Sequence, residues 1–305
     1  MPTDTYAGQS VVAIFNCLQL LGLTLLLLVL LPALFSTRIN RAKTWHTMIL
    51  SGIIYNLCYL PLMILGQQTG PPPSFLICLL QSCLIYCAPV LLMSFALVFL
   101  VDLFLVLTRV VYGTALSSST WIQILLMAVP SLIYVVVFTT TLSKGLQERD
   151  TIERDEANLY CHSTASSPSV FTAIVVLIEA SAMVILEVYM VFLLWKTKRR
   201  LKATGVSDNL SSTFPLSLFF RTLAFGVYVL LSIGITSASL FPSSNSPYWN
   251  LALTSPPIGM ALPFGMQKDI IDFYYQRPRR GNHGPPIEDL GWGANPTLLE
   301  LGSLV

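Results

Sequence analysis

Four charged side chains lie inside segments that are otherwise apolar: Asp102, Glu179, Glu187 and Arg221. A charged group at the centre of a bilayer costs about 2.5–3.5 kcal/mol on a translocon-based scale, so such residues mark ligand contacts, ion pathways or buried pairs. Their chemistry is ionic and hydrogen-bonding rather than covalent. Glu179 lies about 15 Å into its segment at about 1.5 Å per residue. It is predicted either to contact a ligand or ion, or to be a protonated structural carboxyl.

The other three charges share one depth. By the same helical rise, Asp102, Glu187 and Arg221 lie roughly 9–12 Å from one end of their apolar segments. Unpaired charges at that depth are costly, so pairing is expected. The prediction is that Arg221 bridges Asp102, Glu187 or both. The bridge would be either a switch that holds the sixth segment against the third, or a permanent ion pair.

The third and sixth segments also contain four uncharged polar side chains, in the half of each segment away from Asp102 and Arg221. These are Gln81 and Tyr86 in the third segment and Tyr228 and Thr236 in the sixth. Side chains at that level can face one cavity together with Glu179. They are therefore predicted to contact the same ligand, with ordinary packing as the alternative for each residue alone.

The elements that must position these side chains are membrane helices. Hydrophobic residues make up 54% of the 305 residues, charged residues make up 10%, and the mean hydropathy is +0.70. Soluble domains carry about 25% charged residues. A membrane helix needs about 20 apolar residues, and seven segments have such a length: 11–35, 47–66, 74–107, 121–142, 169–195, 214–240 and 248–266. The predicted fold is all-α, a bundle of seven transmembrane helices.

The distribution of cations orients this bundle. Thirteen Lys and Arg residues fall on one side of the seven segments, and three fall on the other, in the acidic loop between the fourth and fifth segments. Loops rich in Lys and Arg stay in the cytoplasm. We therefore predict an extracellular N-terminus over 1–10, a transmembrane domain over 11–266 and a cytosolic tail over 267–305.

No arrangement of residues predicts an enzyme, a cofactor or a metal site. The sequence has no G-x-S-x-G motif and no phosphate-binding glycine loop. In the predicted topology His46 and His283 are cytosolic and His162 is extracellular, so the three histidines cannot converge on a metal. The last segment, 248–266, has no lysine for a retinal Schiff base. The net charge of +2 argues for no particular partner, and no nucleic-acid partner is expected.

The cysteines provide an independent test of the topology. Cys78 stands at the outer end of the third segment, and Cys161 stands in the acidic outer loop. Both would face an oxidising compartment, so a disulfide between them is predicted. Cys83 is the alternative partner for Cys161. Cys17, Cys58, Cys83 and Cys87 lie inside apolar segments, where small buried side chains are expected.

Two basic regions would lie at the inner membrane surface. The stretch WKTKRRLKATG (195–205) is predicted to extend the fifth helix into the cytosol, to contact anionic lipid and to form a partner surface; setting the topology alone is the alternative. The predicted surface comprises Arg109, Lys198, Arg199, Arg200 and Lys202. The tail stretch QKDIIDFYYQRPRR is predicted to form a short amphipathic helix, with Ile270, Ile271, Phe273 and Tyr274 in the headgroup region. The Gly- and Pro-rich residues after it are predicted to be disordered.

The exit of the last segment, LPFGMQKDIIDFYY, is similar to the FG-x-x-x-D exits of fungal seven-helix receptors. Together with the seven helices and the outer bridge, it makes the chain resemble the fungal G-protein-coupled receptor-like family, which includes orphan basidiomycete receptors and relatives of the pheromone receptors. The resemblance implies a multi-pass plasma-membrane receptor that binds an unidentified extracellular ligand and signals through a heterotrimeric G protein. The chain departs from the rhodopsin-like pattern, since Leu103 and Phe104 rather than Arg and Tyr follow Asp102. A small-solute or proton-coupled transporter is the alternative.

Overall fold

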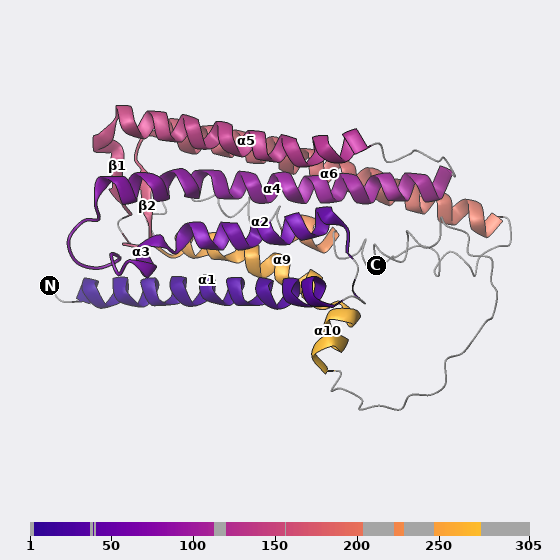
Figure 1. Ribbon diagram of the computed structural model, residues 1–305, viewed down its shortest axis with the longest axis horizontal. Helices are drawn as coiled ribbons and strands as arrows, with labels where there is room; N and C mark the ends of the chain where they lie inside the picture. The colour runs from indigo at the N-terminus through magenta and orange to yellow at the C-terminus, as the bar shows by residue number, and fades with distance from the viewer. Residues whose placement is uncertain are drawn as a thin grey trace.

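The computed structural model describes residues 3–36, 39, 41–112, 120–155, 157–203, 223–228 and 247–275; for residues 3–9, 110, 120, 198, 200–203 and 247–249 it describes the backbone alone. This part of the chain is mostly helical, and its helices run roughly parallel or antiparallel in one elongated bundle (Figure 1).

Four of the helices are long and apolar enough to cross a bilayer: α1 (Thr3–Phe35), α4 (Phe75–Tyr112), α5 (Thr120–Gln147) and α6 (Ser166–Ala203). Their apolar stretches contain 26 to 35 residues, which exceeds the length of about 20 that a bilayer core requires. For α4, 61% of the apolar window is buried inside the protein, against 11% for α5. The central helix is therefore α4, while α5 presents apolar side chains to its surroundings, as expected of a membrane protein.

The remaining described helices are shorter: α2 (Lys43–Tyr59), α3 (Pro61–Ile64), the 3-10 helix η2 (Pro247–Thr254), α9 (Ser255–Gly265), α10 (Lys268–Tyr275) and a helical segment over 223–228. The second predicted segment, 47–66, therefore differs from the structure, where α2 begins at Lys43, ends at Tyr59 and is followed by the short α3. Pro61 explains the early end of α2, because it has no backbone N–H with which to bond the Leu57 carbonyl; the Leu60 N–H bonds to that carbonyl instead.

The helices are arranged around α4 (Figure 1). It contacts α2 on one side and α5 and α6 on the other, while α1 contacts α2 and α9. The N-terminus of α1, the short α3 and a β-hairpin lie at one end of the bundle, which we call the hairpin end. The C-terminus of α1, the N-terminus of α2 and α10 lie at the opposite end, which we call the tail-helix end.

The hairpin was not predicted from the sequence. It follows the 3-10 turn η1 (Arg149–Thr151) and pairs β1 (Ile152–Arg154) with β2 (Cys161–Ser163) in antiparallel register, Glu153 opposite His162. Its turn contains Asn158 at φ 62°, a left-handed conformation that Asn tolerates better than most residues.

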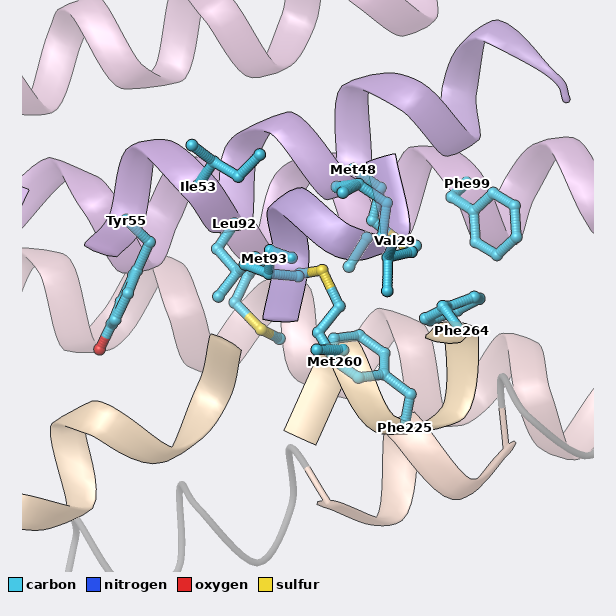
Figure 2. Packing of buried hydrophobic residues seen from close by; sticks show 14 of the residues in the cluster. Val29, Met48, Ile53, Tyr55, Leu92, Met93, Phe99, Phe225, Met260 and Phe264 are labelled. Atoms are coloured by element: carbon cyan, nitrogen blue, oxygen red, sulfur yellow. The ribbon is translucent and has the colours of Figure 1, made fainter. Parts of the chain in front are cut away.

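The core runs along the facing surfaces of α1, α2, α4 and α9. The rings of Phe99, Phe225 and Phe264 meet edge to face, with centroids 5.8 Å apart for Phe99 and Phe264 and 6.2 Å apart for Phe225 and Phe264 (Figure 2). Gly52 lets α2 approach its neighbours closely, since a Cβ there would lie 3.0 Å from atoms of Leu26 and Met260. This close contact joins α1, α2 and α9 in the middle of the bundle.

Candidate functional site

A disulfide between Cys78 and Cys161 fastens the hairpin to the first turn of α4. The two Cα atoms are 5.1 Å apart, and both side chains are buried. The predicted pairing is thus present, whereas Cys83, the alternative partner, is a free buried thiol farther along α4. The hairpin is covalently held at its own end of the bundle.

Two predicted ligand-contacting residues of α4 use their polar atoms to hold this hairpin. Gln81 Oε1 accepts a hydrogen bond from the Cys161 N–H at 3.0 Å, and its Nε2 donates to the Tyr59 carbonyl at 3.5 Å. Tyr86 donates to the Ser163 carbonyl at 3.1 Å and accepts from the Ser163 N–H at 3.3 Å. Both side chains therefore position the hairpin in this structure.

The turn of the hairpin inserts two side chains into the bundle. Leu159 is fully buried, and the Tyr160 ring contacts the rings of Phe15 and Tyr59, with centroids 6.3 and 5.7 Å away. The Tyr160 hydroxyl donates to Asn250 Oδ1 at 3.1 Å. Burial raises the pKa of this phenol, and the Asp155 carboxylate adds to the effect. The hairpin thus closes this end of the bundle over α1, α2 and η2.

Further hydrogen bonds connect the hairpin end to the loop before α4. Arg154 donates to the carbonyls of Gln67 and Gly70, at 3.1 and 3.2 Å. Gln68 and Asn16 exchange two hydrogen bonds between their amides, at 2.7 and 3.0 Å. These contacts join α1, the loop and β1 into one cap.

Glu179 lies beneath this cap, buried between α6 and α4. Ser94 Oγ donates a hydrogen bond to Glu179 Oε1, and both residues are almost fully buried. The second carboxylate oxygen, Oε2, has no hydrogen-bond partner within the described part of the chain. A carboxyl in this position can accept a hydrogen bond, carry a proton or bind a cation. The sequence analysis did not predict Ser94 as a partner of Glu179. A hydroxyl group within a strongly apolar segment could have indicated such a buried hydrogen bond.

Of the three charged residues predicted to pair, the structure describes Asp102 and Glu187. Thr44 on α2 donates a hydrogen bond to Asp102 Oδ2 at 2.7 Å. Glu187 is buried against Gly226, where an added Cβ would overlap the carboxylate, and its Oε1 has no hydrogen-bond partner among the residues described. Arg221 lies outside the described residues, so the bridge that it was predicted to form stays a prediction.

The two remaining predicted ligand contacts come from the sixth segment. Tyr228 is half-buried, and its ring lies so close to Gly259 that any Cβ at this position would overlap it. Thr236 lies outside the described residues. The contact shows that the segment over 223–228 packs tightly on α9.

The predicted basic extension of the fifth helix is present, because α6 continues without a break to Ala203. The backbones of Lys198, Arg200 and Lys202 are helical, and the Arg199 guanidinium lies over the Trp195 ring at 3.7 Å. Arg109 stands in the last turn of α4 and is half-buried. These residues therefore stand on two helices, α4 and α6, at the tail-helix end.

The predicted amphipathic helix of the tail is also present, as α10. Ile270 is buried against the bundle, whereas Ile271, Phe273 and Tyr274 are exposed, each by between two fifths and one half of its surface. These exposed apolar side chains fit the predicted position in the headgroup region.

Two polar contacts that the sequence did not reveal hold α10 in place. The Arg41 guanidinium, which is almost completely buried, forms an ion pair with Asp269. The Tyr274 hydroxyl donates to the Leu28 carbonyl at 2.9 Å. That carbonyl is free to accept because the residue four positions later, Pro32, has no N–H.

A second tyrosine hydroxyl donates to a carbonyl that proline leaves without a helical partner, at the start of α9. The Leu253 carbonyl can receive no helical hydrogen bond from either position three or four residues later, because these are Pro256 and Pro257. The Tyr55 hydroxyl of α2 donates to it at 2.9 Å instead, and Figure 2 shows the Tyr55 side chain extending away from its helix. The prolines that interrupt the seventh predicted segment are thus accommodated by a neighbouring helix.

Within the described residues, no group of three or more His, Cys, Asp or Glu side chains is placed to hold a metal ion. The site consists of a capped end, buried carboxyls at mid-bundle and a basic opposite end, an arrangement suited to binding and rearrangement. Comparison of the chain with protein-family models and with curated protein sequences finds no match.

Proposed function

We propose that the protein is a multi-pass receptor of the plasma membrane that binds an extracellular ligand and signals through a heterotrimeric G protein. The observation that carries the proposal is the difference between the two ends of the bundle. A disulfide-held hairpin caps one end, and a basic continuation of α6 projects from the other. An outer cap with an inner charged surface suits a protein that receives a signal on one side of a membrane and delivers it on the other.

The proposed topology completes the bundle. The four long apolar helices, together with α2, the sixth segment and the η2–α9 segment, would make seven spans, with the hairpin end outside. In this orientation the basic end of α6 faces the cytosol, in accordance with the preference of cations for that side.

The proposed ligand contact is Glu179, since its Oε2 is buried and unused within the described part. Gln81 and Tyr86 would act on the ligand through the hairpin that they hold. Tyr228 and Thr236 stay proposed contacts from the sixth segment. The proposed switch is a bridge from Arg221 to Asp102, Glu187 or both; Asp102 also accepts a hydrogen bond from Thr44.

The alternative function is a small-solute or proton-coupled transporter. One observation favours it: Glu179 and Glu187, both on α6, are buried carboxyls that each have an oxygen without a hydrogen-bond partner among the described residues. Carboxyls of this kind mark ion and proton pathways in membrane proteins.

A yeast G-protein reporter strain tests the proposal. We expect one member of a panel of peptides, lipids, pheromones and nutrients to activate the reporter in cells that carry the full chain. Glu179→Leu should then reduce the potency of that compound at least ten-fold, about 1.4 kcal/mol, at unchanged surface expression. Glu148→Gln is the matched control, because Glu148 is exposed at the end of α5. Proton-dependent uptake of a panel compound, with a silent reporter, would support the transporter instead.

The basic end of α6 gives a separate prediction. Replacing Lys198, Arg199, Arg200 and Lys202 together with Gln should reduce G-protein activation several-fold while the amount of protein at the surface stays the same. The reason is that each cation near an anionic leaflet contributes about 1 kcal/mol, and the same charges would face the partner. The control replaces Lys144 and Arg149, which lie at the hairpin end. Expression and signalling that fall in proportion would show that these charges only set the topology.

A further inference from the structure

We propose that Gln19 of α1 and Asn56 of α2 bind at least one internal water molecule where α1, α2 and α9 meet. Both side chains are completely buried. Gln19 Nε2 and Oε1 and Asn56 Oδ1 have no hydrogen-bond partner among the residues that the structure describes. Buried polar atoms are rarely left in this state, because each loses its hydration without compensation.

The register of α1 against α2 places the two amides at one level. Residues three and four positions apart share a face of a helix. Near one end of the shared stripe, the Phe15 ring contacts the Tyr59 ring, with centroids 6.1 Å apart. Near the other end, a Cβ on Gly22 would lie 3.3 Å from Asn56 Oδ1. Gln19 lies on the same stripe between these two contacts, so it faces α2 between Tyr59 and Asn56.

The surroundings of this position come from a third helix. A Cβ on Gly22 would also lie 3.2 Å from Pro257 Cβ and 3.4 Å from Ile258 Cγ1. The amides therefore lie beside the start of α9, where Tyr55 of α2 already supplies the hydrogen bond to the Leu253 carbonyl.

The chemistry of the free atoms selects water over a cation. Asn56 Nδ2 donates to the Gly52 carbonyl of its own helix at 3.2 Å, which leaves Oδ1 as an acceptor. Gln19 offers two N–H donors and one acceptor oxygen. A water molecule donates to both oxygens and accepts from the amide N–H, whereas a cation would be repelled by that N–H. The side chains that the structure places beside these amides, Phe15, Tyr59, Pro257 and Ile258, carry no carboxylate.

The water would add a polar contact between α1 and α2, beside the hydrogen bond from Tyr55 to the Leu253 carbonyl. Hydrogen bonds through water reorganise without breaking a direct side-chain pair. This inference does not depend on the proposed receptor function, because it concerns only the packing of α1, α2 and α9.

A structure of the full chain in lipid nanodiscs, at a resolution that shows ordered water, tests the proposal directly. We expect a density peak within about 2.7–3.2 Å of both the Gln19 amide and Asn56 Oδ1. A direct hydrogen bond between the two side chains, with no peak beside them, would overturn it. Replacing sodium by choline in the buffer should leave the melting temperature unchanged; stabilisation that requires sodium would identify a cation site and also overturn it.

Variants supply an independent measurement. Gln19→Leu and Asn56→Leu should each lower the melting temperature by about 2–4 °C, because each strands the polar atoms of the other residue. The double variant should return to the wild-type value, since it removes all the free polar atoms. Ser181→Ala is the control, because its hydroxyl bonds only to the Leu177 carbonyl of its own helix among the described residues. Two single variants that each raise the melting temperature would show uncompensated amides and contradict the proposal.

Discussion

If the protein is at the plasma membrane, as proposed, replacing Cys161 with Ser is expected to remove most of it from the cell surface. The disulfide joins residues 83 positions apart and fixes the hairpin that closes one end of the bundle. Loss of such a bond costs about 2–5 kcal/mol, which is a large share of the 5–15 kcal/mol or so by which folded proteins are stable. Cys78→Ser should have the same effect, and the double variant should be no worse than either single one. Surface biotinylation measures the loss.

The control for this experiment is Cys83→Ala, on the same helix. Cys83 is free and buried, so its replacement should leave surface expression near the wild-type level. Mass spectrometry of the non-reduced protein should recover the peptides of Cys78 and Cys161 as one linked species. A linkage from Cys161 to Cys83, or normal expression of the Cys161 variant, would contradict the prediction.

The ion pair that holds α10 gives the second large effect. Asp269→Asn should destabilise the protein by about 1–3 kcal/mol, because it removes the carboxylate charge that pairs with the buried Arg41 guanidinium. The double variant Arg41→Leu with Asp269→Leu should recover much of that loss, since it removes the charge together with its partner. Thermal unfolding gives the stability, and hydrogen exchange over 268–275 shows whether α10 detaches.

Asp272→Asn is the matched control, since Asp272 lies on the same helix and has no ion pair within the described part of the chain. It should leave both the melting temperature and the exchange of α10 unchanged. Equal losses for Asp269→Asn and Asp272→Asn would show that helix charge, rather than the pair with Arg41, stabilises the tail.

The sequence predicted those features that depend on one segment at a time. The long apolar helices, the helical course of the basic stretch and α10 follow from composition and periodicity along the chain. The disulfide was also predicted, because an assigned topology placed two cysteines on one side of a membrane. In each case the prediction depends on the residues of one segment or on the distribution of Lys and Arg between the loops.

The features that were missed depend on which way a side chain faces. Depth along a helix is read from the sequence, but the angle around its axis depends on partners far away in the chain. The hydrogen bonds of Gln81 and Tyr86 to the hairpin, for example, cannot be predicted from depth alone. Arg41 looked like one loop cation among several, whereas it is buried and paired with a residue 228 positions later. The hairpin itself has strands of three residues, too short to give an alternating pattern.

The hydrogen bond from Tyr274 to Leu28 has a mechanical consequence. Helices bend most readily where a proline interrupts their hydrogen bonding, and Pro32 makes such a point near the end of α1. The free carbonyl at that point is the one that Tyr274 of α10 uses as its anchor. A change in the curvature of α1 alters the direction of this carbonyl. The α10 helix then either moves with the carbonyl or loses the hydrogen bond from Tyr274. The curvature of the first helix and the position of the last described one are therefore coupled through this hydrogen bond.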